Sequence, residues 1–281
     1  MRVVGKGNAN ILIDYGDSDY LYRCLVRNNK ISLNNEFTRA NFKYINEYVK
    51  QYLNGLDCPL EMTLIPTGLI QSTLTEYIDV FDEEEVVVFK IPNLKPKYFY
   101  KVLQSDHFTT VFTVDKVDKV LLEVKPKWVH YSTSYCRNCT HNLLKGRNIN
   151  YCYSKLINNK LHLRDILSDC KDSLPREFTD DILLYLDEEN NVFKVLHNAQ
   201  KQLSTNKILS LKSEDDVEME LLLLMSIRDV TCFIEWEISS RKKFKVNIVD
   251  LDLKPKTKWS HWLKTHLELE YFKEKKYHIE T

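Results

Sequence analysis

The spacing of hydrophobic residues changes near Lys127, and this change constrains the fold more than any other feature of the chain. Before it, short apolar or alternating segments predict strands, at 2–4, 9–15, 20–26, 85–91 and 117–124. Within this part, helical spacing is found at 38–53. After it, helical spacing dominates, at 143–186 (interrupted by Pro175), 193–203 and 218–228, before a predicted hairpin of 231–238 and 244–250. These patterns predict an α+β protein.

The loop at 104–107 is the predicted boundary between two lobes. A β-rich N-terminal lobe, 1–106, would precede a larger mixed C-terminal lobe, 107–281. A chain of this length buries enough surface for two cores without disulfides. A cleft between two lobes is a preferred place for a ligand.

Composition excludes several classes of protein. The chain has 40 Lys and Arg against 40 Asp and Glu, so its overall field does not attract nucleic acid, and anion binding requires local clusters of basic residues. The 43% hydrophobic content argues against disorder. No apolar segment approaches the roughly 20 residues that a bilayer requires, and we expect no membrane association. Seven cysteines cannot all pair, and no signal peptide is recognisable, so we expect reduced thiols and an intracellular location.

Two strands end in the same tripeptide. Lys125-Pro126-Lys127 follows the strand at 117–124, and Lys254-Pro255-Lys256 follows the apolar segment 246–249. Proline stops a strand, and lysines two apart on an extended backbone point to the same side. One such tripeptide is explained by a charged turn at the surface. Its repetition favours a function.

Three acidic residues accompany these junctions. Alternation places Asp250, Asp252 and Lys254 on one face, a set that suits Mg²⁺ and phosphate, although a solvated edge strand would look the same. Asp229 lies between a helix ending at Arg228 and an apolar strand. An acidic residue there is either a turn residue or a base that accepts a hydroxyl proton.

Cysteines with metal-ligand spacing follow the first junction. Cys136 and Cys139 are three apart, and Cys152 and His141 are near in sequence, so a Cys₃His or Cys₂His₂ zinc site is one interpretation. Buried reduced cysteines are the other. His141 and Lys145 share a helix face at four-residue spacing, which equally favours a polar site for His141.

A glycine-containing loop, Gly5-Lys-Gly7-Asn-Ala-Asn10, joins the first two strands and is either an ordinary turn or a loop that covers phosphates. Further segments are Glu123-Val-Lys-Pro-Lys127, Cys136-Arg-Asn-Cys-Thr-His141, Arg228-Asp-Val-Thr231 and Asp250-Leu-Asp-Leu-Lys-Pro255. With these segments, in this order along the chain, the sequence resembles the inositol-pentakisphosphate 2-kinases, especially the short fungal type.

The resemblance implies a two-lobed fold distantly like protein kinases, with ATP between the lobes and Mg²⁺ on its phosphates. It implies transfer of the ATP γ-phosphate to the 2-hydroxyl of inositol 1,3,4,5,6-pentakisphosphate, giving the hexakisphosphate, phytic acid. It implies Asp229 as the catalytic aspartate and Asp250, with Asp252, as the magnesium ligands. The implied nucleotide contacts are Gly5, Lys6, Gly7, Asn8, Ala9, Asn10, Arg23, Asp106 and His107. The implied substrate contacts are Lys125, Lys127, His141, Lys145, Asn191, Lys194, Lys254 and Lys258, and Lys90 replaces a family arginine.

Two other functions are consistent with the same residues. One is a non-catalytic, zinc-bearing module that binds RNA or phosphoinositides, and the other is a kinase-like scaffold without turnover. Asp229 and Asp250 argue against the binding module, because a module that binds anions has no use for carboxylates facing its ligand, whereas the scaffold predicts no ATP turnover. We expect a monomer that acts on small molecules and binds no nucleic acid. The fungal relatives imply a nuclear location.

Overall fold

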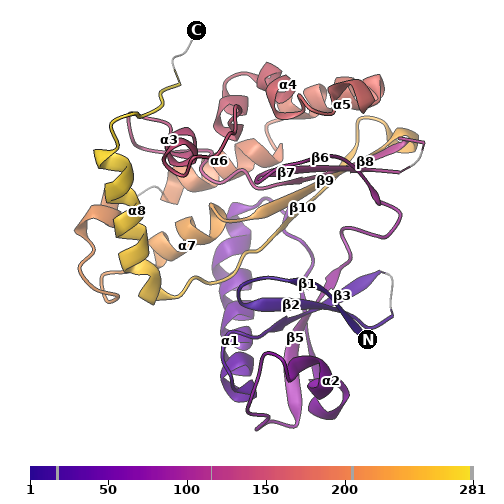
Figure 1. Cartoon of the computed structure of the whole chain (residues 1–281), viewed down its shortest axis with the longest axis vertical. Helices are drawn as coiled ribbons and strands as arrows, with labels where there is room; N and C mark the ends of the chain where they lie inside the picture. The colour runs from indigo at the N-terminus through magenta and orange to yellow at the C-terminus, as the bar shows by residue number, and fades with distance from the viewer. Residues whose placement is uncertain (17–18, 115, 204–205, 279–281) are drawn as a thin grey trace. The chain divides into compact units, whose positions relative to one another are not determined.

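The computed structural model describes residues 1–16, 19–114, 116–203 and 206–278, which form two compact units (Figure 1). The first comprises 1–48 and 58–97, and the second comprises 49–57 and 98–281. Each contains one five-stranded antiparallel sheet and several helices, so the observed class is α+β. The boundary expected after 106 falls in a hairpin of the second unit, because the strands at 101–113 pair with strands from later in the chain.

The first unit is built on a sheet of order β1-β2-β3-β5-β4. Its strands are β1 (Arg2–Lys6), β2 (Asn10–Asp14), β3 (Tyr20–Leu25), β4 (Glu61–Pro66) and β5 (Glu85–Pro92). Ile11, Ile13 and Val88 from the sheet pack with Ile70 and Leu74 from α2 (Thr67–Leu74), and all five are buried. Burying these side chains stabilises the unit by about 1.5–3 kcal/mol each.

Helix α1 (Ile31–Tyr44) begins earlier than the hydrophobic spacing predicts. The side chains that it buries include Asn34, Asn35, Thr38 and Asn41. Asn35 accepts a hydrogen bond from the Val87 amide at 2.7 Å and donates one to the Glu85 carbonyl at 2.8 Å. A buried helix face made of hydrogen-bonding residues carries no apolar periodicity, which is why the first turns were missed.

The second unit has a sheet of order β10-β9-β8-β7-β6. Its strands are β6 (Lys101–Ser105), β7 (Thr109–Thr113), β8 (Lys119–Val124), β9 (Thr231–Glu237) and β10 (Phe244–Val249). Its helices are α3 (Arg137–Leu144), α4 (Leu163–Ile166), α5 (Arg176–Asp187), α6 (Val192–Leu203), α7 (Met219–Ile227) and α8 (Trp259–Tyr271). Across the described residues, no helix has both the length and the apolarity to cross a bilayer.

The helical segment predicted at 143–186 is not continuous. Between α3 and α5 the chain makes short turns at Tyr153–Ile157 and Lys160–His162 and the single-turn α4. Pro175 precedes α5, as its fixed φ angle favours. Together these short turns bury a few apolar residues, whose spacing along the sequence resembles that of one long helix.

Strand register brings three connections to one edge of the second sheet. Val124, at the end of β8, pairs with Cys232 near the start of β9. Thr231 in turn pairs with Val249, the last residue of β10. Because these neighbours are antiparallel, the segments after β8, before β9 and after β10 meet at the same edge. Those segments carry both Lys-Pro-Lys tripeptides and Asp229.

Candidate active site

Asp229 lies between the two lysine-proline junctions. It occupies the short turn between α7 and β9, where its amide donates to the Ser226 carbonyl at 3.0 Å. Lys127 Nζ lies 2.7 Å from one carboxylate oxygen, and Lys254 Nζ lies 3.0 Å from the other. Three residues more than 20 positions apart along the chain therefore form one charged cluster at the sheet edge.

The cluster controls the ionisation of Asp229. Burial alone raises the pKa of this carboxyl, but the charges of Lys254 and Lys127 outweigh burial and hold the pKa well below its usual range. Asp229 is therefore ionised at neutral pH. A carboxylate of such low basicity orients a hydroxyl group more effectively than it removes the hydroxyl proton.

Both junctions contain a non-glycine residue with left-handed backbone. Lys127 has a φ angle of 58°, and Asp250 has a φ angle of 66°. This conformation costs of order 1 kcal/mol or more and persists where surrounding contacts impose it, often at functional sites. Thr231 donates its hydroxyl to the Asp250 carboxylate at 2.8 Å, and Ser226 donates to the Asp252 carbonyl at 2.8 Å. These contacts hold the Asp250 carboxylate and the Asp252 backbone, and both side chains carry the carboxylate oxygens that Mg²⁺ prefers.

A basic pocket of about 330 Å³ lies between α3, α7 and α8. Its basic side chains are Arg137, His141, Lys145, Arg228, His261 and Lys264. His141 and Lys145 were predicted from the sequence. The other four were not assigned a role, although Arg228 and Arg137 stand within the recognised segments.

Two of the pocket's guanidinium groups approach the ring of Trp128. Arg137 lies 4.9 Å and Arg228 5.3 Å from the ring centre. Burial and the charge of Arg228 lower the pKa of Arg137 to about 10. Within the described residues, neither guanidinium forms an ion pair with a carboxylate. Two buried, mutually repelling cations are costly on their own, and an anionic ligand would relieve that cost.

His141 is neutral in this environment. Burial, followed by the nearby charges of Arg147 and Lys145, lowers its pKa to about 4. Lys145 Nζ lies 3.8 Å from Glu268, and the Lys145 side chain is exposed. Lys125 is half-buried and lines a small recess with Phe108 and Tyr151. Lys125 shares this recess with Lys127, whereas His141 and Lys145 line the basic pocket with Arg228.

Three further predicted substrate residues are placed differently. Asn191 is buried, and its side chain donates to the Leu186 and Glu188 carbonyls and accepts from the Phe193 and Lys194 amides. In this structure Asn191 caps α6 through these four hydrogen bonds, and its contact with substrate stays a prediction. Lys194 Nζ contacts the Asp187 carbonyl and Glu189 at 3.0 Å. Lys258 is exposed just before α8.

The predicted nucleotide residues occupy two hairpin turns. In the first unit, Gly5 and Lys6 end β1, Asn10 begins β2, and the turn from Gly7 to Ala9 between them is closed by the Gly7 amide on the Asn10 carbonyl at 2.8 Å. Arg23 lies on β3, and Lys90, on β5, is 3.8 Å from Glu61.

In the second unit, Asp106 and His107 form the turn between β6 and β7. The Asp106 carboxylate accepts from two turn amides and from the Tyr151 hydroxyl. Burial, with the charges of Arg147 and Lys127, lowers the pKa of His107.

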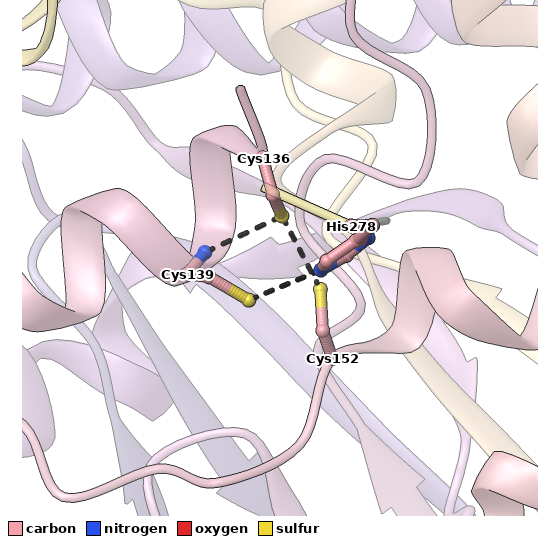
Figure 2. Close-up of side chains that lie close together, drawn as sticks. All are labelled: Cys136, Cys139, Cys152 and His278. Carbon is pink, nitrogen blue, oxygen red and sulfur yellow. Dashed lines mark hydrogen bonds between the residues drawn. The ribbon is translucent and has the colours of Figure 1, made fainter. Parts of the chain in front are cut away.

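The cysteines form a separate cluster in the second unit. Figure 2 shows Cys136, Cys139 and Cys152 facing His278, and their ligand atoms all lie within 4.8 Å of one another. His141, a candidate ligand by its sequence position, lies outside this cluster and lines the basic pocket. Residues two apart on a helix point to opposite sides, so Cys139 and His141 do not share a site. The fourth member, His278, comes from near the C-terminus, where no spacing in the sequence indicates it.

Comparison with known proteins agrees with these features. Residues 153–268 match the family model described as inositol-pentakisphosphate 2-kinase. A protein of that name from Saccharomyces cerevisiae is 45% identical over 272 residues, covering 96% of each chain. Those from Candida glabrata and Kluyveromyces lactis are 38% and 34% identical, covering 95% and 97% of this chain and 96% of their own.

Proposed function

The chain belongs to the inositol-pentakisphosphate 2-kinase family, and we infer that it phosphorylates inositol pentakisphosphate to inositol hexakisphosphate with ATP as the donor. The acceptor would be the 2-hydroxyl of the 1,3,4,5,6-pentakisphosphate. One observation carries the proposal: a carboxylate, Asp229, lies within hydrogen-bonding distance of two lysines, beside a pocket whose two arginines form no ion pair with a carboxylate among the described residues. The basic groups suit a small, densely charged anion. The carboxylate suits the hydroxyl that the anion carries.

The residues suggest how the acceptor is handled. Asp229 accepts a hydrogen bond from the attacking hydroxyl and aligns its oxygen lone pair for in-line attack. In the absence of substrate, Lys127 and Lys254 pair with Asp229. When substrate binds, their ammonium groups would also contact its phosphate groups. As the hydroxyl becomes bonded to phosphorus its acidity rises, so even a weakly basic carboxylate can take the proton late in the reaction.

Asp250 and Asp252 are the residues proposed to hold magnesium. Thr231 occupies one Asp250 oxygen, and the rest of this donor set is carboxylate and carbonyl oxygen, which fits Mg²⁺. When bound, the ion would neutralise charge on the nucleotide phosphates. Separately, the segment Gly5 to Asn10 of the first unit is proposed as a nucleotide contact through its backbone amides.

The decisive experiment is incubation with ATP, Mg²⁺ and inositol pentakisphosphate, followed by ion chromatography of the products. We expect stoichiometric hexakisphosphate and ADP. Tight binding of the pentakisphosphate without transfer would favour the non-catalytic module instead. If the protein instead phosphorylates another phosphate ester that carries a free hydroxyl, the kinase activity would stand but the proposed substrate would be wrong.

We also propose that the cysteine cluster binds a structural zinc ion. Three sulfurs and one ring nitrogen form a donor set common in structural zinc sites. The Cys136 and Cys152 sulfurs are 3.7 Å apart. Zn–S bonds of about 2.3 Å at tetrahedral angles place two sulfurs about 3.8 Å apart. His278 turns Nε2 toward the Cys139 sulfur, at 3.3 Å, while Nδ1 lies 3.2 Å from the Tyr131 hydroxyl, a second contact typical of zinc-bound histidine.

The zinc would fasten the C-terminal segment to the start of α3. Backbone contacts already join them, from the Cys136 amide to the Lys276 carbonyl at 2.7 Å and from the Lys276 amide to the Thr140 hydroxyl at 3.0 Å. Elemental analysis of the purified protein should find one zinc per chain. Cys152→Ala should lose the metal, while Cys170→Ala, which removes a buried thiol outside the cluster, should keep it. Absence of zinc from the wild-type protein, or its retention in Cys152→Ala, would rule the site out.

A further inference from the structure

The segment that follows β8 is held by two amide side chains. From Pro126 to His130 the backbone belongs to neither a helix nor a strand, so its polar groups need other partners. Asn138, on α3, accepts from the Trp128 amide at 3.1 Å and donates to the Pro126 and Trp128 carbonyls at 3.2 and 2.7 Å.

Gln200, on α6, holds the same segment by alternate groups. Its side-chain oxygen accepts from the Val129 and His130 amides, both at 3.0 Å, and its nitrogen donates to the Lys127 carbonyl at 2.9 Å. Gln200 has no exposed surface and lies among apolar residues of the buried face of α6. Placing an amide there is costly unless its hydrogen bonds are made, and every one it makes goes to this segment.

The segment includes Lys127, whose conformation and position are both unusual. Its φ angle of 58° is left-handed, and its ammonium group lies 2.7 Å from Asp229. The carbonyl that Gln200 holds is that of Lys127, and those that Asn138 holds flank it. Together the two amides form six hydrogen bonds to the backbone on either side of the left-handed residue.

We propose that Asn138 and Gln200 are positioning residues that impose the backbone of Lys127 and thereby aim its ammonium group at Asp229 and the phosphates of the acceptor. The inference rests on the proposed function. Strain at a functional residue must be maintained by contacts elsewhere, and these two side chains supply them. Misplacement of a reacting or binding group by about 1 Å can cost 100-fold in rate.

The test compares Gln200→Leu with a matched control, Gln104→Leu. Gln104 is also a buried glutamine of the second unit, but it donates to the Ile166 carbonyl at 2.7 Å and so holds a different backbone. Both variants should lose stability. In Gln200→Leu, kcat/KM for inositol pentakisphosphate should fall about tenfold or more, with KM for ATP within about twofold of wild type. Gln104→Leu should change neither.

A second variant and a double mutant separate positioning from folding. Asn138 is only partly buried, so Asn138→Ala carries less risk of unfolding and should reproduce the selective loss. In a Lys127→Ala background, Gln200→Leu should have little further effect, because it acts through Lys127. Additive losses, equal losses for ATP, or the same loss in Gln104→Leu would overturn the proposal.

Measurements of ligand binding and of amide hydrogen exchange can test the positioning role even if the proposed function is wrong. If the wild-type protein transfers no phosphate, the proposed function fails, but calorimetric titration with inositol pentakisphosphate still decides the inference. Gln200→Leu should bind it at least about tenfold more weakly, and the Val129 and His130 amides should exchange faster. Unchanged binding and exchange would refute positioning even in an active enzyme, and a wild-type protein that binds no pentakisphosphate would refute both.

Discussion

Removal of the Lys127 ammonium group should weaken the binding of inositol pentakisphosphate far more than that of ATP. A charge-assisted hydrogen bond contributes about 1.5–3 kcal/mol where it is desolvated. The Lys127 side chain is 27% exposed, so the lower part of that range, about 1.5–2 kcal/mol, applies. At 1.4 kcal/mol per factor of ten, Lys127→Ala should lose about 10- to 30-fold in affinity.

The free enzyme sets a limit on this loss. Without ligand, Lys127 is paired with Asp229 at 2.7 Å, and that interaction weakens when a phosphate arrives. Lys127→Ala has no such pair to weaken on binding, so the measured loss equals the phosphate contact minus the Asp229 contact, and about 10- to 30-fold is its upper limit. Lys254, at 3.0 Å from the same carboxylate, keeps Asp229 ionised in the variant.

Calorimetric titration at low and at moderate salt provides the assay. The matched control is Lys119→Ala, which removes a lysine from the other end of β8 that also pairs with a carboxylate, Glu237, at 3.2 Å. The difference between wild type and Lys127→Ala should shrink as salt rises, because screening weakens charge contacts. Affinity within twofold of wild type at low salt would refute the assignment. If affinity for ATP and for inositol pentakisphosphate fell equally, Lys127 would instead be assigned to the nucleotide phosphates.

Three further outcomes follow from the same geometry. Asp229→Ala should lower kcat about 100-fold or more while nucleotide binding, measured by titration, survives; near-wild-type turnover would remove the assignment. Asp250→Asn should raise the Mg²⁺ concentration needed for half-maximal rate with little change in pentakisphosphate binding, and an unaltered metal dependence would point to another carboxylate. The pKa of His141 is lowered from 6.5 to about 4, so the unfolded chain takes up its proton first as pH falls. The wild-type protein should therefore lose stability from pH 6.5 toward 4, and His141→Asn should lose less in urea unfolding; parallel curves would contradict this.

Local chemistry made much of the second sheet predictable. Proline at 126 stops an extended segment wherever the chain goes, so the end of β8 at Val124 could be located from its own residues. The hairpin of β9 and β10 is similarly a property of adjacent apolar segments. The lysines and aspartates of the two junctions could be named as a set, because their residue types restrict what they bind.

Which of these residues meet was decided by the tertiary structure. Antiparallel register, not spacing along the chain, brings Lys127 and Lys254 to the two oxygens of Asp229. His278 joins cysteines that lie more than 120 positions earlier, and Gln200 supports a segment 70 positions earlier, without any local signal. Periodicity and turn chemistry record what a residue does with its close neighbours. A buried amide or a fourth ligand is defined by a partner that only folding supplies.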